Sequence, residues 1–293
     1  MTAVTATAAI AETPSAHDGF VSFVRRHPTV AAGGALLVVI VVAALAAPWL
    51  GTVDPISINP SQRLRGMSAE HWFGTDRFGR DLYSRVIYGG RVSLIVGLSV
   101  AALSTLIGLA IGLVSGYMRA VDAVVMRVMD GMMAIPAIML AIALIALSKA
   151  SILIVIVAVT LPEVPRVVRL VRSIVLTLRE QAYIEAATAI GTSVPRILLR
   201  HLLPNALPPL IVQATYICAS AVLIEAALSF LGAGTPPEIP SWGNIMAEAR
   251  PYFQLKPWMV LLPGVFLAVT VLAINLVGDG LRDMLDPRLA RRM

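Results

Sequence analysis

The sequence predicts an all-α integral membrane protein with six transmembrane helices. Of its 293 residues, 58% are hydrophobic and 14% are charged, and the mean hydropathy is +0.83. An ordinary soluble domain is about half apolar and about one quarter charged. Long uncharged runs recur along the chain, each close to the roughly 20 residues that cross a bilayer. A soluble enzyme and a disordered chain are excluded, because neither has this composition.

The first transmembrane helix is expected at residues 25–50, because residues 30–50 carry no charge. This run is too long and begins too late to be the apolar part of a secretory signal peptide. Residues 1–24 are expected to form a disordered cytoplasmic tail. An extracytoplasmic loop is expected at 51–91, where Asp54-Pro55 and Asn59-Pro60 are turn signals.

The other five spans are expected within residues 92–280, at 92–118, 131–148, 151–171, 203–231 and 257–278. The middle of this region is uncharged from 131 to 162 except for Lys149. One helix over those 32 residues would be about 48 Å long, which is too long for a bilayer. A tight turn at Lys149 therefore divides it into two spans. A loop at 172–201 and a cytoplasmic tail at 281–293 complete this organisation.

The charge predicts the orientation of the spans. The net charge is +6, which in a membrane protein fits cationic flanks of the spans, and we expect no nucleic-acid partner. With both termini inside, the inner segments hold 14 of the 23 Lys and Arg residues. Arg25 and Arg26 precede the uncharged run of the first span, and the next cation is Arg63. The positive-inside rule therefore favours N-in and C-in.

Two features of the spans suggest close packing and anchoring. Gly108, Gly112 and Gly116 form a stripe of small residues on which another helix can pack. The partner is either another helix of this chain or a helix of another subunit. In the second outer segment, Trp242 and the nearby Trp258 are typical of an aromatic belt at the membrane interface.

The loop at 172–201 predicts a short helix from Arg179 to Ile190, made of strong helix formers. Gly191 can take the left-handed conformation that ends a helix, and Pro195 suits the first turn of the next segment. Small residues on one face let another surface approach closely. Two interpretations stay open: a rigid element that transmits force from a cytoplasmic partner, or a helix lying passively on the membrane.

Glu185-Ala186-Ala187, then Gly191, then His201-x-Leu203-Pro204 resembles the EAA motif in permease subunits of ABC importers. That motif ends in Ile-x-Leu-Pro, and His in the first place is similar to the dipeptide and oligopeptide permeases of the DppC/OppC type. Further blocks resemble the same subgroup over residues 20–290. These are Gly74-Thr75-Asp76, Gly79-Arg80-Asp81, Glu225 to Gly232, Pro240-Ser241-Trp242-Gly243, Asn275 to Asp283, and Leu285-Asp286-Pro287.

The resemblance implies the type I ABC importer permease fold, in a bacterial-type plasma (inner) membrane, with residues 92–280 as the permease core. It implies a second homologous permease subunit, two ATPase subunits or domains and an extracytoplasmic substrate-binding protein as partners. The chain itself would bind no cofactor, because ATP and Mg²⁺ belong to the ATPases. It would hold no metal and no catalytic residue. The residues it implies for ATPase coupling are Tyr183, Ile184, Glu185, Ala186, Ala187, Gly191, Leu203 and Pro204.

The implied function is half of the translocation pathway for dipeptides or oligopeptides, while nickel, glutathione and other small solutes stay open as substrates. No phosphate-binding loop G-x-x-x-x-G-K-[ST] occurs in the sequence, which agrees with a non-catalytic subunit. A membrane-embedded enzyme is not favoured either, because the four histidines are scattered over tail, flank and loops.

Carboxylates at membrane depth support a rival hypothesis, an ion-coupled secondary transporter. Asp130 and Asp279 are expected at inner helix ends, where charged residues are ordinary. Glu225 lies between long uncharged runs, so it either lines the pathway or accepts a hydrogen bond that locks its helix. Such transporters usually show internal repeats, and we find none here.

Overall fold

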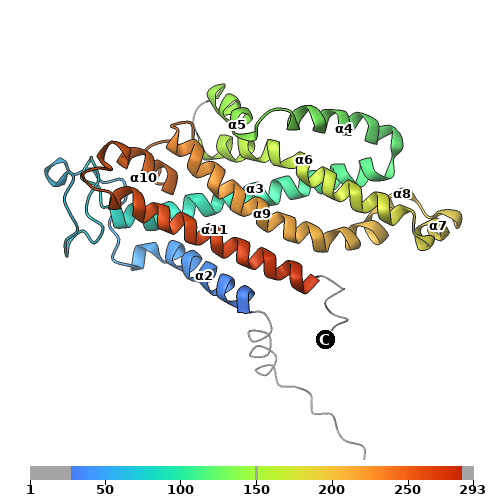
Figure 1. Ribbon diagram of the computed structural model, residues 1–293, viewed down its shortest axis with the longest axis horizontal. Helices are drawn as coiled ribbons and strands as arrows, with labels where there is room; N and C mark the ends of the chain where they lie inside the picture. Colours follow the sequence, from blue (N-terminus) through green and yellow to red (C-terminus); the bar gives the residue numbers. More distant parts are fainter. Residues whose placement is uncertain (1–27, 149–150, 286–293) are drawn as a thin grey trace, which may run out of the picture.

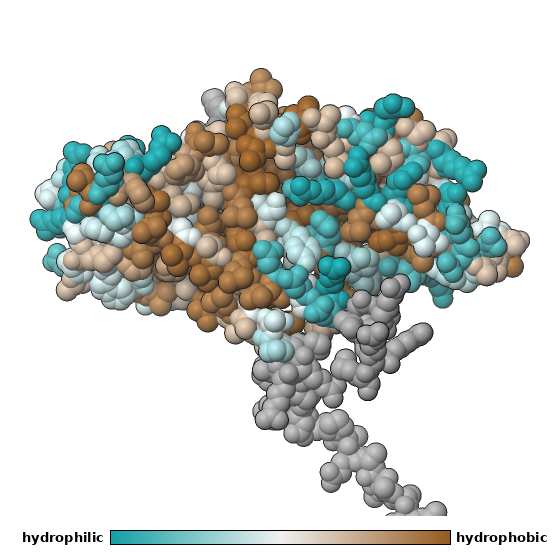
Figure 2. Space-filling model, in the orientation of Figure 1, coloured by the Kyte–Doolittle hydropathy of each residue, from teal (hydrophilic) through white to brown (hydrophobic). Residues whose placement is uncertain are grey.

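The computed structural model describes residues 28–148 and 151–285, and every regular element within them is a helix. Figure 1 shows the long helices running side by side, with α10 (Trp242–Ala249) and the loop before α3 at one end. The short helix α7 (Ala182–Ala189) lies at the other end. Figure 2 shows a hydrophobic band between two more hydrophilic ends, as expected of a membrane protein.

The first two long helices differ at their ends from the expected spans. Helix α2 (Pro28–Leu45) stops before residue 50, and the chain tightens there into the 3₁₀ turn η1 (Ala47–Trp49), which contains Pro48. Helix α3 (Leu82–Tyr117) begins ten residues before the expected position 92. The cause is the Asp81 N-cap, whose carboxylate accepts a hydrogen bond from the Ser84 N–H at 2.7 Å. Capping therefore extends this helix beyond its apolar run.

The expected continuous span at 131–148 is wrong. The structure instead has α4 (Arg119–Met133) and α5 (Ala137–Ala146), which are bent by 86° relative to each other. Pro136 lies at the bend, and a proline offers no N–H to the helix and disfavours helical backbone at the residue before it. The turn expected at Lys149 lies outside the described residues.

Helix α6 (Ile152–Arg179) runs eight residues beyond the expected end at 171 and takes up the start of the expected loop 172–201. After α7 come α8 (Val194–Ile197) and the π-helical turn η3 (Leu198–Leu202), which leads directly into α9 (Leu203–Phe230). The bounds of α9 agree with the expected span 203–231. Two more 3₁₀ turns, η2 and η4, span Pro60–Gln62 and Arg250–Tyr252. Helix α11 (Trp258–Leu285) extends seven residues past the expected end at 278.

Four helical stretches of the described chain are long and apolar enough to cross a membrane: α2, α3, the run from α8 to α9, and α11. The bent pair α4–α5 is a fifth candidate. Helix α6 has 28 residues but carries Glu163 and several arginines, so composition alone does not mark it. The count of six spans and the N-in, C-in orientation remain predictions.

The glycine stripe of α3 packs against α6 of the same chain. A Cβ added to Gly108, Gly112 or Gly116 would lie 2.4–2.7 Å from the Cβ of a valine on α6. Those valines are Val167, Val171 and Val175, all fully buried. Of the two partners considered for the glycine stripe, a helix of this chain is therefore the one observed. Because glycine has no side chain, the two helix backbones approach closely.

Two further helix pairs also pack closely at glycine residues. Helix α2 packs along α11, where Gly33 meets Leu276 and Gly280 meets Val30. Helices α9 and α11 meet where Gly278 lies against Thr215. Trp242, expected in an interfacial belt, is instead 1% exposed, and its indole N–H donates to the Val86 carbonyl at 3.0 Å. It is a core residue that fixes α10 onto α3.

Candidate functional site

Helix α7 is held to the rest of the chain by two side chains on one face. Ile184 and Ala187, three residues apart, are buried and so fix one side of this short helix. Tyr183, Glu185 and Ala186 are exposed. Most residues that the sequence assigned to coupling thus face solvent, while Ile184 and Ala187 act as the anchors.

The end of α7 is a helix-stop motif formed around Gly191. Gly191 has φ = +80°, in the left-handed region that favours glycine. Its N–H donates to the Thr188 carbonyl at 3.0 Å, and the Thr192 N–H donates to the Ala187 carbonyl at 3.0 Å. These two bonds are the Schellman pattern, which satisfies carbonyls at a helix end. The predicted role of Gly191 as terminator agrees with this geometry.

The two halves of the predicted coupling motif, residues 183–191 and 201–204, come close together at α7. The Tyr183 ring lies 6.3 Å from the His201 ring, measured between centroids. Leu203 is half-buried at the start of α9 and Pro204 is exposed beside it. A shallow hollow lies against α7, and its walls are Tyr117, Arg119, Arg179, Ile184, Glu185, Thr188 and Ala189. This end of the molecule therefore offers an exposed helix next to a concave surface.

A ladder of ion pairs joins α6 to α4 near this end. Arg172 pairs with Asp122 in a two-bond contact, one of them 2.6 Å between Nη2 and Oδ2. Arg169 Nη2 donates to Asp130 Oδ1 at 2.6 Å. The Arg172 guanidinium, hydrogen-bonded to it, lowers the pKa of the Asp122 carboxyl below its ordinary value. The sequence shows the arginines three apart, but it gives no sign that acids on α4 are their partners.

Two carboxylates lie within the helix bundle. Glu163 is 1% exposed and accepts a hydrogen bond from Arg166 at 3.1 Å. Glu225 is fully buried and accepts hydrogen bonds from Ser93 of α3 at 3.0 Å and from Ser229 at 2.8 Å. Glu225 was predicted as a pathway candidate or as a locking residue. Its burial against α3 favours the locking alternative, because its carboxylate faces its own chain.

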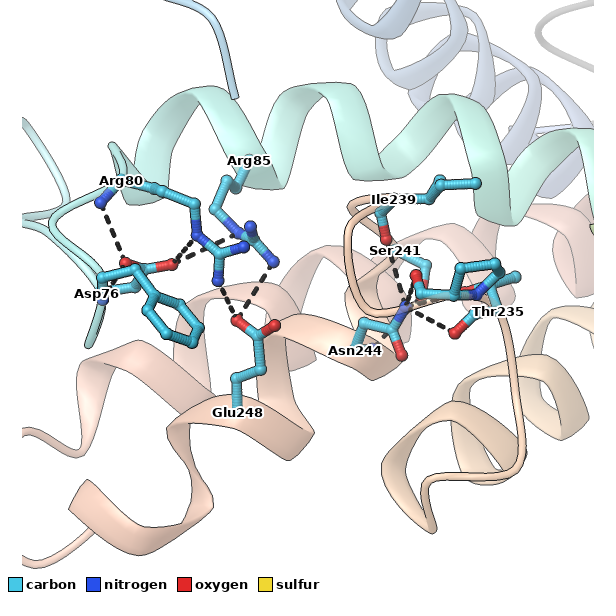
Figure 3. A network of polar contacts seen from close by, with 10 residues as sticks. Asp76, Arg80, Arg85, Thr235, Ile239, Ser241, Asn244 and Glu248 are labelled. Carbon is cyan, nitrogen blue, oxygen red and sulfur yellow. Dashed lines mark hydrogen bonds and ion pairs between the residues drawn. The ribbon is translucent and has the colours of Figure 1, made fainter. Parts of the chain in front are cut away.

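The end of the molecule opposite α7 contains a buried charged cluster that the sequence did not predict. Arg80 Nε lies 2.5 Å from Asp76 Oδ2, and Arg85, with no exposed surface, lies 3.2 Å from Glu248 Oε2 (Figure 3). Arg80 also contacts Glu248. The cluster joins the loop before α3, the first turn of α3 and α10. A buried charge left without its partner is costly, so the cluster fixes α10 to the start of α3.

Beside this cluster, Asn244 holds the segment before α10 in place. Its side-chain amide donates to the carbonyls of Thr235, Pro236 and Ile239 at 3.0–3.1 Å, as Figure 3 shows in part. Among the residues that the structure describes, no group of three or more His, Cys, Asp or Glu side chains could hold a metal ion. The single cysteine, Cys218, is a buried free thiol.

Comparison with known proteins gives a consistent result. Residues 104–291 match the family described as "Binding-protein-dependent transport system inner membrane component". The chain is 53% identical over 272 residues to a probable peptide ABC transporter permease protein, y4tQ, of Sinorhizobium fredii, covering 93% of each chain. It is 42% identical to the dipeptide transport system permease protein DppC of Alkalihalophilus pseudofirmus, covering 84% of this chain and 81% of that protein.

A third relative is the probable D,D-dipeptide transport system permease protein DdpC of Escherichia coli, which is 38% identical and covers 83% of this chain and 82% of its own length. Among solved structures, the chain resembles an inward-facing MetNI methionine ABC transporter with a TM-score of 0.55. That match has 23% sequence identity and covers 69% of this chain and 96% of the other. It shows the fold alone, an all-α ABC importer permease.

Proposed function

This chain belongs to the binding-protein-dependent transport system inner membrane components, and we propose that it forms half of the passage of a peptide importer. As a permease of this family it serves ATP-driven import through the inner membrane. The second permease, the two ATPases and the extracytoplasmic binding protein are the partners that the proposal requires. ATP and Mg²⁺ would bind to the ATPases, since this chain has no phosphate-binding loop.

The observation that carries the coupling part of the proposal is the shape of α7. It is an exposed helix with two buried anchors, a closed Schellman end and a hollow beside it. A helix held this way keeps its shape when another protein pushes on it. We infer that α7 is the surface that the ATPase binds, with Glu185 and Tyr183 facing the ATPase.

Peptides are the proposed substrate class because of the relatives. Three that cover at least four fifths of this chain carry peptide or dipeptide transport in their names. The ion-coupled alternative has less support from the carboxylates than the sequence suggested. Glu163 is bonded by Arg166, Glu225 by two serines and Asp130 by Arg169. Carboxylates occupied in this way are structural partners rather than free proton sites.

The coupling proposal is tested with the full complex in proteoliposomes, by measuring dipeptide uptake and ATP hydrolysis in parallel. Glu185→Ala is expected to lower uptake per ATP roughly tenfold, which lies within the usual range of coupling free energies. The matched control is Glu180→Ala, since Glu180 is also exposed and lies just before α7. Gly191→Ala should act like Glu185→Ala, because a left-handed alanine costs about 1–2 kcal/mol, whereas Gly191→Asn should be milder.

Three results would contradict parts of the proposal. Normal uptake per ATP in both Glu185→Ala and Gly191→Ala would remove α7 as the coupling element. Uptake driven by an ion gradient without ATP would remove the ABC mechanism for this chain. Uptake of other small solutes but of no peptide would leave the mechanism and remove the substrate class.

A further inference from the structure

Two clefts of different chemistry lie on either side of α9. The apolar cleft, about 590 Å³ in volume, lies between α2, α3, α9 and α11, and Leu207 and Ile211 are among its walls. The polar cleft, about 470 Å³, lies between α6, α9 and α11. Its polar walls are Gln213, Tyr216 and Arg282, and its apolar walls are Leu170, Pro208, Pro209, Val212 and Leu285. The seam between Gly278 and Thr215 brings α9 and α11 together near both clefts.

The two clefts lie at the same depth along α9. Leu207 and Pro208 are neighbours in the chain, and Ile211 and Gln213 are two residues apart. At 1.5 Å per residue, these walls on α9 differ by only about 3 Å along the helix axis, whereas on α11 Arg282 lies about 12 Å nearer the helix end than Ile274. Polar side chains at a lipid headgroup layer would surround the helix on every side at that level. On α9 the difference is lateral, which favours water at the polar cleft and lipid chains at the apolar cleft.

The polar cleft has a cation, Arg282, in its wall and an anion, Asp279, bonded to its wall residue Tyr216. Tyr216 Oη donates to Asp279 Oδ1, and Asp279 is exposed. Arg282 follows Asp279 by three residues on α11 and is likewise exposed. Pro208 and Pro209 have no N–H, so the carbonyls of the residues four positions earlier lack their usual helical donors. A cation thus lines the cleft, and an anion lies beside it.

We propose that the polar cleft lines the inner part of the solute passage, with Arg282 meeting the carboxylate and Asp279 the ammonium of a passing peptide. This inference rests on the proposed function and names residues of this chain for it. A zwitterionic peptide needs both charges, and Tyr216 would hold Asp279 in place for it.

Water access is tested by cysteine labelling in the assembled complex, in a Cys218→Ala background, because Cys218 is the only native cysteine. Gln213→Cys places a thiol in the polar cleft and Ile211→Cys places one in the apolar cleft. A membrane-impermeant cationic methanethiosulfonate is added from the cytoplasmic side. Gln213→Cys should react at least about tenfold faster, since the reagent needs a thiolate in water. Equal rates, or no reaction at Gln213→Cys, would overturn the water-facing assignment.

The peptide assignment is tested by uptake of dialanine into proteoliposomes. Arg282→Gln and Asp279→Asn should each lower the uptake rate about tenfold, which corresponds to about 1.4 kcal/mol. Arg282→Lys should retain most of the rate, because it keeps the cation, and Tyr216→Phe should lower it less than Asp279→Asn. ATP hydrolysis reports whether each complex has assembled. Wild-type uptake rates in both Arg282→Gln and Asp279→Asn would overturn the assignment.

The two proposals fail in different ways. A wild-type complex that carries no dialanine contradicts the proposed substrate class, whereas fast labelling of Gln213→Cys would still place water in the polar cleft. Normal dialanine uptake in the wild type and in every cleft variant leaves the proposed function and removes the further inference.

Discussion

The contact between α3 and α6 predicts a stability change that can be worked out from the coordinates. A Cβ on Gly108 would lie 2.4 Å from Val167 Cβ and 2.6 Å from Val167 Cγ1. Carbon atoms in contact sit about 3.5–4.0 Å apart, so Gly108→Ala requires the backbones to separate by more than about 1 Å. Such overpacking costs about 1–3 kcal/mol, and the better helix propensity of alanine offsets about 1 kcal/mol.

We expect a net loss of up to about 2 kcal/mol for Gly108→Ala, or a fall of roughly 4–8 °C in melting temperature for a chain of this size. The matched control is Gly34→Ala, because a Cβ there has nothing within 4 Å and Gly34 is also helical. That control should be neutral or slightly stabilising. Both are measured on the isolated chain purified without partner subunits, by following thermal aggregation.

The result also separates the two interpretations of the glycine stripe. If the stripe serves a partner subunit, Gly108→Ala would leave the isolated chain as stable as Gly34→Ala and would weaken only assembly. A melting temperature for Gly108→Ala at or above that of Gly34→Ala would therefore refute the intramolecular packing argument. A fall in the isolated chain, with Gly34→Ala unchanged, would support it.

Two further predictions concern the polar contacts. Ser93→Ala removes a donor to the buried Glu225 and should destabilise the purified chain by about 1–3 kcal/mol, so an unchanged melting temperature would contradict the locking role of Glu225. Asp122→Asn should weaken the contact between α4 and α6 by up to about 1 kcal/mol, since the Asp122–Arg172 pair is partly exposed. Relative to the wild type, hydrogen exchange should become faster in α4 and stay unchanged in α11. Because Arg172 lowers the pKa of Asp122, this contribution is present at neutral pH and is lost as the pH falls through that lowered pKa. Equal protection factors of α4 at neutral and low pH, after correction for the pH dependence of intrinsic exchange, would contradict it.

Much of the fold could be predicted because it follows from local rules. The apolar run that became α9 has the expected bounds, and Gly191 ends α7 as its sequence context indicates. The start of α3 was missed because hydropathy marks lipid contact, whereas the Asp81 cap extends the helix into a polar region. The break between α4 and α5 was missed because Pro136 lies inside an uncharged run, where its backbone effect is invisible to a count of charges.

The partners of the charged residues could not be predicted because they depend on the tertiary fold. Ser93 is 132 residues from Glu225, so its hydrogen bond cannot be read from local spacing. The arginines of α6 repeat every three residues, which indicates one face, but the acids that pair with Arg169 and Arg172 lie on a separate helix. The partner of Tyr216 could not be predicted either, because its hydrogen bond to Asp279 joins α9 to α11 beside the polar cleft.

The packing links α7 to the polar cleft through α6. Ile184 belongs to the same buried cluster as Val171 and Val175 of α6, and the close seam with α3 keeps that part of α6 rigid. Leu170, next to Val171, lines the polar cleft. Packed interiors transmit displacement rather than absorb it. A push on α7 should therefore reach α6 and its face of the cleft, and also α9 and α11, since Leu210 and Ile274 belong to the same buried cluster.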